Sequence, residues 1–273
     1  MAISMNLRRS VLGVVFIGVF ALLFQTLLSP ALAGNEPNRA TVKVYSHILE
    51  EERTMFVSLP EGYEASKKAY PVLYVLDAEG ETLFPKCVST LMDLNAKEIV
   101  PAMIVVGIWN TNRNRDMIPE SVSNRPGSGG SSHFLSFIHS ELIPYIQKNY
   151  RASDYSTLYG MSNSALFAVY ALLEKPETFD AVIASSPMIG HCAMYMQNKA
   201  EAFIKKDPES DLLLFMIYGT EDSRRVTEFV PDFQNYLKTF ASKEFISKLE
   251  ILDGEGHVPA SSLKRGLEYI FNR

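Results

Sequence analysis

The sequence predicts an α/β fold: a mostly parallel, doubly wound sheet of about eight strands with an N-terminal antiparallel hairpin. Two observations carry this prediction. Short apolar runs, of the kind shown by strands buried on both faces, alternate with stretches of helical periodicity. Ahead of them, two β-rich runs flank a short acidic turn, a pattern that is typical of a hairpin.

The N-terminal end has the pattern of a secretory signal peptide. Two arginines precede an apolar run over residues 11–28, and a small-residue exit ends at Ala33. We therefore expect residues 1–33 to be cleaved after Ala33, residues 34–273 to form one domain, and the protein to be secreted or periplasmic. The apolar run is longer than that of most signal peptides, so an uncleaved membrane anchor is the alternative.

The elements that follow can be placed one by one. The hairpin strands are expected at 41–48 and 53–59, around an acidic turn at 50–52. The strands of the main sheet are expected at 71–76, 103–107, 156–160, 181–184, 212–218 and 248–252. Helices are expected at 83–94, 134–148, 163–174, 224–241 and 260–271. This alternation implies right-handed crossovers and helices on both faces of the sheet.

Composition narrows the range of partners. The full chain carries a net charge of −5 and no cluster of Lys and Arg, which argues against nucleic acid and an anionic membrane surface as partners. No metal-ligand cluster, phosphate-binding loop or dinucleotide fingerprint occurs, so we expect no metal and no cofactor. The expected partner is a small-molecule ester, with a membrane partner only if the N-terminal segment stays uncleaved. Cys87 and Cys192 either form a disulfide or are separate buried thiols.

The stretch 109–132 has the weakest secondary-structure signal in the chain. It is rich in Asn, Pro, Gly and Ser. Long loops inside compact domains are often functional, and this one follows the fourth predicted strand, at the sheet edge where open α/β folds bind ligands. We expect it to form a rim or lid over the site; the alternative is a plain surface loop.

A serine lies at the apex of a strand, turn and helix pattern. Gly160-Met161-Ser162 ends an apolar run and leads at once into a helical stretch. This order is typical of the nucleophile elbow of α/β-hydrolases, where the crowded turn requires small residues on both sides of the serine. Ser164 stands where a second glycine is usual. The alternative interpretation is an ordinary turn.

Two further loops supply the groups that a serine nucleophile needs. Its hydroxyl requires a base to take its proton and an acid to orient that base. Glu221 and Asp222 follow the strand at 212–218, and His257 follows the last strand. Because parallel strands end at one edge of the sheet, these loops are expected to meet. The predicted catalytic residues are Ser162, Asp222 and His257, with Glu221 as the alternative acid.

The negative oxygen of a tetrahedral intermediate needs preorganised N–H donors. One is expected to be the amide of Asn163, which follows the nucleophile, and the other the amide of Glu79 in the loop after the third strand. The alternative is that this loop is only the start of a helix. His47, His133, His139 and His191 fit the order of the site less well and are expected to be structural.

Taken together, these residues resemble the esterase-D-like branch of α/β-hydrolases, and within it the bacterial hydrolases related to siderophore (enterobactin-type) esterases. The resemblance runs from about Thr41 to Phe271. It is carried by 72–77, 104–108, Arg113 with Asp116 and Pro119, 129–145, the elbow, 185–187, 219–222 and 256–257. It implies a Ser-Asp-His triad with Asp222 as the acid. Ser164 and Ala78 depart from the family pattern at positions where glycine is common.

We therefore expect a serine hydrolase that cleaves carboxylic esters through an acyl-enzyme intermediate. Acyl transfer to an alcohol on the same scaffold is one alternative. A catalytically silent binding protein that kept the fold is another. The sequence does not identify the ester.

Overall fold

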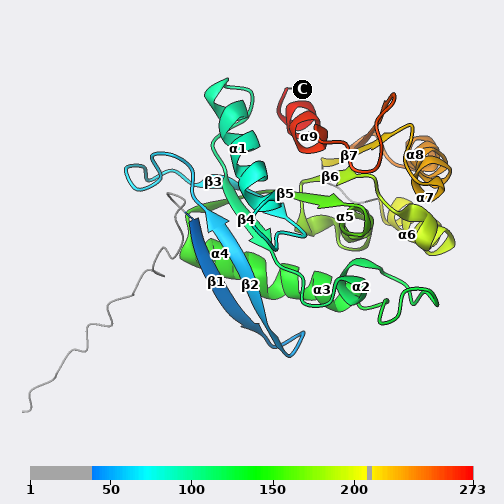
Figure 1. Cartoon of the computed structure of the whole chain (residues 1–273), viewed down its shortest axis with the longest axis horizontal. Helices are drawn as coiled ribbons and strands as arrows, with labels where there is room; N and C mark the ends of the chain where they lie inside the picture. Colours follow the sequence, from blue (N-terminus) through cyan, green and yellow to red (C-terminus); the bar gives the residue numbers. More distant parts are fainter. Residues whose placement is uncertain (1–38, 208–210, 273) are drawn as a thin grey trace, which may run out of the picture. The chain divides into compact units, whose positions relative to one another are not determined.

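The structure is a computed structural model that describes residues 39–207 and 211–272 (Figure 1). The expected signal peptide and its cleavage site after Ala33 lie outside the described residues. No helix within those residues has the length and apolar character that crossing a membrane requires.

A mixed sheet of eight strands forms the centre of the described chain, in the order β1-β2-β4-β3-β5-β6-β7-β8. The strands are β1 (Arg39–Ser46), β2 (Glu51–Ser58), β3 (Tyr70–Val75), β4 (Ile104–Ile108), β5 (Ala152–Met161), β6 (Ala181–Ser185), β7 (Leu212–Gly219) and β8 (Phe245–Leu252). β1 and β2 pair antiparallel, as do β2 and β4, and all other neighbours run parallel. The predicted fold class, including its N-terminal hairpin, is confirmed.

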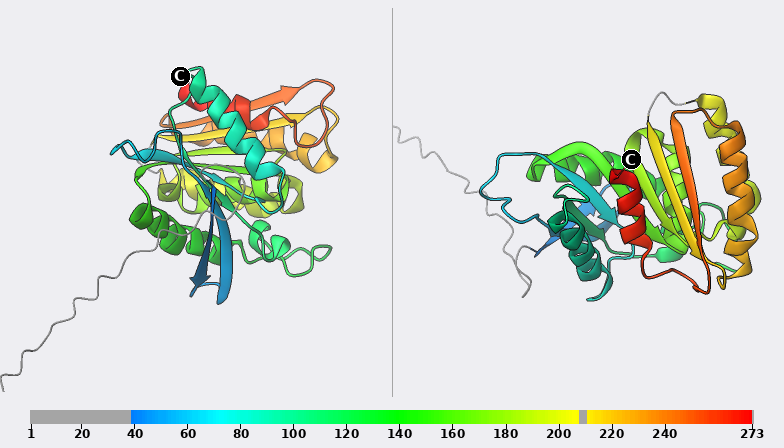
Figure 2. Two further views of the ribbon diagram at one scale, coloured as in Figure 1. Left: turned by 60° about the vertical axis from the view of Figure 1, so that its left-hand side comes forward. Right: turned by 90° about the horizontal axis from the view of Figure 1, so that it is seen from above.

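Helices cover both faces of this sheet. They are α1 (Leu83–Ala96), α2 (Arg113–Met117), α3 (Ser131–Phe137), α4 (Ile143–Asn149), α5 (Asn163–Glu174), α6 (Ala193–Lys206), α7 (Arg224–Thr227), α8 (Phe229–Phe240) and α9 (Ser262–Phe271). A π-helical turn, Ile138–Leu142, joins α3 to α4, and 3₁₀ turns lie at Pro176–Thr178 and Ile189–His191. α1 and α9 lie side by side on one face, while α3 to α6 and α8 cover the other (Figures 1 and 2).

The central helix α5 explains why the elbow is rigid. Every residue from Asn163 to Leu173 is buried. A helix that is apolar all round belongs in the interior, and α5 packs between β5 and β6 on one side and α6 on the other. The first turn of α5 is therefore fixed against the sheet.

Helix α6 was not predicted. Its buried stripe is narrow and consists of Met196, Ala200 and Phe203, while most other positions are polar. The helical signal of a sequence comes from the contrast between an apolar and a polar face, and here the apolar face is thin. The i, i+4, i+7 spacing of these three residues was the signal available.

The hairpin turn lies earlier than predicted. Residues 47–50 form the turn, with Glu50 at a φ of 55°, and Glu51 and Glu52 already belong to β2. Their charges are compensated within the sheet, because Nζ of Lys43 lies 2.8 Å from a carboxylate oxygen of Glu52, and Arg53 and Arg115 pair with Glu51. Opposite charges across a ladder stabilise strand pairing, so the acidic run does not mark the turn.

The segment 109–132 has more structure than its composition suggested. It contains α2, and its end returns to α2 through hydrogen bonds from the amides of Gly129 and Gly130 to the carbonyls of Ile118 and Arg115, at 2.9 and 3.0 Å. The segment lies at the carboxyl edge of the sheet; its role as a lid stays a prediction.

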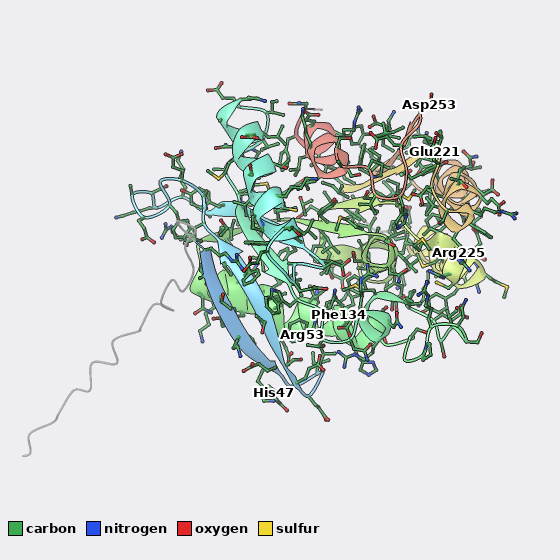
Figure 3. All side chains as sticks on the ribbon, viewed as in Figure 1. His47, Arg53, Phe134, Glu221, Arg225 and Asp253 are labelled. Atoms are coloured by element: carbon green, nitrogen blue, oxygen red, sulfur yellow. The ribbon has the colours of Figure 1, made fainter. Side chains whose placement is uncertain are left out.

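A buried ion pair anchors this segment to the hairpin. Nη1 of Arg53 lies 2.8 Å from Oδ2 of Asp116, and both side chains are fully buried. Nη2 of Arg53 donates to the carbonyl of Trp109 at 2.7 Å, and the guanidinium lies 4.9 Å from the ring centre of Phe134 (Figure 3). Hydrogen bonds, first from Arg115, lower the pKa of Glu51 beside this pair to about 2. These charged side chains therefore join β2, the loop after β4, and α2.

Both cysteines are free thiols in this structure. Cys87 lies in α1 and Cys192 at the start of α6, and both are buried. Burial raises the pKa of each thiol to about 12. Of the two alternatives, the structure has the separate thiols.

Candidate active site

Ser162 lies at the sharp turn between β5 and α5, with φ 59° and ψ −117°. A positive φ is uncommon for a residue with a side chain and often marks a functional turn. A Cβ on Gly160 would lie only 2.4 Å from the carbonyl oxygen of Ser164. Glycine is therefore required at 160, because any other residue would push the helix away from the strand.

Ser164 replaces the usual second glycine without opening the elbow. Its side chain is fully buried, and its Oγ accepts a hydrogen bond from the amide of Met161 at 2.8 Å. The same oxygen lies 2.7 Å from Oδ2 of Asp77 and 2.8 Å from the carbonyl of Met161, either of which can accept its proton. The departure from the family pattern thus adds a hydrogen-bonded link between the elbow and the loop after β3.

The structure brings the three predicted side chains together. Oγ of Ser162 lies 2.9 Å from Nε2 of His257, and Nδ1 of His257 lies 2.6 Å from Oδ1 of Asp222. Ser162 follows β5, Asp222 follows β7 and His257 follows β8. The side chain of Asp222 is fully buried, whereas that of His257 is 41% exposed. A substrate can therefore reach the hydroxyl and the imidazole but not the carboxylate.

The alternative acid points elsewhere. Glu221 is exposed, and its only hydrogen bond within the described residues runs from its amide to the carbonyl of Glu255, at 2.9 Å. Its side chain projects from the outer end of the loops after β7 and β8 (Figure 3). Glu221 thus faces solvent, whereas Asp222, the next residue of the loop, faces His257 and is its carboxylate partner.

The two predicted oxyanion donors are backbone amides. Within residues 39–207 and 211–272, neither the amide of Asn163 nor that of Glu79 has an acceptor. The amide of Ala78, which directly precedes Glu79 in the loop after β3, donates to the carbonyl of Ile108 at 3.1 Å. Ala78 lacks a positive φ, so the glycine common there in the family is not needed in this chain.

An ion pair beside these amides was missed at the level of sequence. Nε and Nη2 of Arg113 each lie 2.8 Å from an oxygen of Asp77, and Nδ2 of the Asn110 side chain donates to the same carboxylate at 2.5 Å. Hydrogen bonding to Asp77 raises the pKa of Arg113. The available signal was position, because Asp77 and Asn110 each follow the end of a strand at the ligand-binding edge.

A cationic rim near the elbow is formed by Arg125 and Arg225, whose guanidinium groups lie around His191. The adjacent amide of Met188 donates to the carbonyl of Ser162 at 3.4 Å, which places this segment next to the elbow. Neither guanidinium has a carboxylate partner within the part of the chain that the structure describes. Burial first, and then the two guanidinium charges, lower the pKa of His191 to about 4 (Figure 3 shows Arg225). The rim offers uncompensated positive charge.

The remaining histidines have no part in this constellation. His47 lies on the hairpin turn, and His133 and His139 lie in the helical segment 131–149. Nδ1 of His139 is 3.0 Å from the hydroxyl of Thr178, and burial lowers the pKa of this histidine. Among the described residues, no three His, Cys, Asp or Glu side chains are grouped as metal ligands would be.

Comparison with known sequences places this geometry in context. The Esterase family model, described as "Putative esterase", matches residues 46–253. Ferri-bacillibactin esterase BesA of Bacillus subtilis is 26% identical over 237 residues, which cover 76% of this chain and 81% of that protein.

Comparison with solved structures gives the same result for the fold. An IroE-like serine hydrolase from Shewanella oneidensis is similar with a TM-score of 0.79 and 28% identity, over 86% of this chain and 80% of that one. Siderophore hydrolase EstA from Aspergillus nidulans is similar with a TM-score of 0.75 and 21% identity, over 89% and 98%. The eight-stranded sheet is therefore that of the α/β-hydrolase fold.

Proposed function

Because the chain belongs to the esterase family, we propose that it hydrolyses carboxylic esters through a triad of Ser162, His257 and Asp222 and an acyl-enzyme intermediate. The observation that carries the proposal is the hydrogen-bonded series from the Ser162 hydroxyl through the His257 imidazole to the Asp222 carboxylate, at 2.9 and 2.6 Å. Nucleophile, base and orienting acid are within direct reach of one another, as this chemistry requires.

In the first half of the reaction, Oγ of Ser162 attacks the acyl carbon while Nε2 of His257 takes its proton. The tetrahedral intermediate collapses as the bond to the alcohol oxygen breaks, and His257 returns the proton to that oxygen. Water then attacks the acyl-enzyme with His257 again as base, which releases the carboxylic acid and restores the Ser162 hydroxyl. No other proton carrier is needed.

Asp222 acts through His257. Its carboxylate accepts the Nδ1 hydrogen, which fixes the tautomer with Nε2 free to accept the serine proton, and its negative charge stabilises the imidazolium. Because the Asp222 side chain is fully buried, water screens that charge little. The free amides of Asn163 and Glu79 would bind the oxyanion, and one such donor contributes about 10²- to 10³-fold in kcat.

We propose further that the ester is a siderophore-type substrate that carries several anionic oxygens. BesA is a ferri-bacillibactin esterase and EstA is a siderophore hydrolase. The cationic rim supports the same substrate class, because Arg125 and Arg225 have no carboxylate of their own to neutralise them and can bind catecholate oxygens.

The catalytic assignment is tested by Ser162→Ala. We expect turnover of p-nitrophenyl esters to fall to the uncatalysed rate and labelling by a fluorophosphonate to disappear, while the thermal unfolding midpoint stays unchanged. Ser136→Ala, at a half-buried position of α3, is the matched control and should keep both activities. Labelling or turnover that survives in the Ser162 variant would remove the assignment; a wild-type protein that is never labelled would indicate the silent binding relative. Products formed with and without an added alcohol separate hydrolysis from acyl transfer.

The substrate assignment has its own test. The double variant Arg125→Gln, Arg225→Gln should lower kcat/KM for a catecholate trilactone, free or holding Fe(III), by about 10-fold or more, and leave a neutral p-nitrophenyl ester within about twofold. The loss should shrink as salt concentration rises. Equal losses for the two esters would show that the rim does not select anionic substrates.

Export remains part of the proposal. The signal-peptide pattern supports cleavage after Ala33 and a secreted or periplasmic enzyme. Edman sequencing of the exported protein should begin at Gly34. A sequence that began at Met1 would favour the membrane anchor.

A further inference from the structure

Two residues near His257 have backbone conformations that their side chains disfavour. Ser186 has a φ of 51° and Val258 a φ of 59°. A β-branched residue with positive φ is a genuine outlier, and Val258 also precedes Pro259, a position that favours extended backbone. Such a conformation persists only where the surrounding structure enforces it, and it is concentrated at functional sites. The contacts of Val258 therefore show what enforces it.

The first contact is a hydrogen bond to the end of β6. The amide of Val258 donates to Oγ of Ser186 at 2.8 Å. Ser186 is itself fixed, because its own amide donates to the carbonyl of Ile217 in β7 at 2.7 Å and no part of the residue is exposed. The hydroxyl that binds Val258 is thus attached to the centre of the sheet.

A second connection starts from the neighbouring residue of β6. Oγ of Ser185 lies 2.7 Å from Oγ of Ser262, and Ser262 donates to the carbonyl of Pro259 at 2.6 Å. Both serines are fully buried. Because the single hydrogen of Ser262 goes to Pro259, Ser185 is the donor between the two hydroxyls. The chain is therefore fixed at Val258 and again at Pro259, directly after His257.

The position of His257 depends on how the backbone at Val258 and Pro259 is fixed, because few packing contacts hold its side chain. Its side chain is 41% exposed, so packing contributes little to its position. The imidazole is placed by the backbone of residue 257 and by its hydrogen bonds to Ser162 and Asp222. If Val258 relaxed to a negative φ, the peptide that joins it to His257 would rotate, and Nε2 would move away from the serine hydroxyl.

We propose that Ser186 is a positioning residue for His257: its hydroxyl holds the strained backbone of Val258 and thereby keeps the imidazole within reach of Ser162. Ser186 does not touch the reacting atoms. This inference rests on the proposed function, because it assigns His257 the role of base. It adds that the position of the base is set from β6, a strand that contributes none of the three triad residues.

The kinetic test is Ser186→Ala, which removes the hydroxyl and keeps the Cβ. We expect kcat for p-nitrophenyl acetate to fall roughly 10- to 100-fold, because the base is displaced by a fraction of an ångström, while KM changes by less than about threefold. The matched control is Ser156→Ala, which removes another buried hydroxyl, one that donates to the carbonyl of Thr178 at 3.2 Å near the opposite edge of the sheet. Its kcat should stay within about twofold of wild type.

Amide hydrogen exchange gives a readout that does not depend on activity. Exchange over residues 254–261 should be faster in Ser186→Ala than in the wild-type protein, and unchanged in Ser156→Ala. If the wild type hydrolysed no ester and exchange rose as expected, the proposed function would fail while the fixation of the loop stood. An unchanged exchange rate, or a wild-type kcat in the Ser186 variant, would overturn the inference.

A second variant covers the case in which Ser186→Ala does not fold. Val258→Gly relieves the strain, because glycine adopts positive φ readily, and it adds freedom at the same point of the chain. Combined with Ser186→Ala, it should give a folded protein whose kcat lies within about threefold of that of Val258→Gly alone, because glycine keeps the positive φ without the hydrogen bond. A loss of about 10-fold or more in the combined variant relative to Val258→Gly would show that Ser186 does not act through the backbone of residue 258.

Discussion

Replacing Gly160 by alanine should damage both the stability and the chemistry of the elbow. The new Cβ would lie 2.4 Å from the carbonyl oxygen and 2.5 Å from the carbonyl carbon of Ser164, and 2.8 Å from the amide nitrogen of Ala165. Ordinary contact begins at 3.4 Å, so β5 and α5 must separate by 3.4 − 2.4 = 1.0 Å at this point. All three obstructing atoms are backbone, and no side chain can rotate to make room.

The magnitude follows from that displacement. Overpacking of this kind costs about 1–3 kcal/mol, and about 2 kcal/mol lowers the Tm of a domain of this size by roughly 4–8 °C. Ser162 lies between the two elements that move, and a misplacement of about 1 Å costs on the order of 100-fold in kcat. Calorimetry and the initial rate of p-nitrophenyl ester hydrolysis measure the two effects separately.

Gly266→Ala is the matched control for this prediction. Its Cβ would lie 2.6 Å from the side chain of Ile183, so it creates a similar overlap in the core beneath α9 without involving the elbow. Because the obstructing atoms at Gly266 belong to a side chain, we expect a smaller fall in Tm than for Gly160→Ala, and an unchanged kcat for the folded protein. Wild-type kcat in the Gly160 variant, or an equal loss of kcat in the Gly266 variant, would refute the reasoning.

Three further predictions concern the polar interior. Asp116→Ala removes the fully buried carboxylate that pairs with Arg53 and leaves Glu51 as the remaining anionic partner of that guanidinium. Urea denaturation should show a loss of about 1–3 kcal/mol, and an unchanged free energy of unfolding would contradict this. Ser164→Ala leaves the backbone amide of Met161 without its acceptor and removes a hydrogen-bond donor to Asp77. The free energy of unfolding should therefore fall by about 1–3 kcal/mol. An unchanged free energy of unfolding would count against the hydrogen-bonded link between the elbow and the loop after β3. The pKa of His191 is lowered to about 4 in the folded protein. As pH falls below about 6.5, His191 therefore takes up a proton in the unfolded chain but not in the folded chain, and the free energy of unfolding falls. His191→Asn should therefore lose less stability between about pH 7 and about pH 4.5, by roughly 1 kcal/mol after allowance for solvent screening, and equal losses in variant and wild type would be the contrary result.

The two departures from the family pattern have different physical outcomes. Ser164 fits because its side chain finds partners in the space that a glycine would leave, on Met161 and Asp77. Ala78 fits because its backbone does not adopt the conformation that requires glycine. In both cases the motif alone suggested a weakened site, whereas the geometry of the elbow and of the β3 loop is retained.

Two elements were missed or misplaced by prediction from the sequence, each for a physical reason. The thin apolar stripe of α6 gave too little contrast between its faces. The acidic run at 50–52 indicated a turn, yet Glu51 and Glu52 lie in β2, where cations from β1, from β2 itself and from α2 compensate them. Arg115 comes from a distant part of the chain, and Lys43 comes near Glu52 only through the pairing of β1 with β2, so a local pattern does not show that these cations compensate the acidic run.

The alternation of strands and helices, the crowded turn at Ser162 and the chain order of nucleophile, acid and base could all be predicted from the amino-acid sequence. These features are local or follow from the rule that parallel strands end at one edge. Three features became visible only in the folded chain: Asp222 and not Glu221 turns toward His257, Asp77 joins Arg113 and Ser164 in one network, and the Ser186 hydroxyl accepts a hydrogen bond from the amide of Val258. The direction of a side chain in a loop depends on backbone dihedrals set by contacts with distant segments, and those contacts exist only once the sheet has formed.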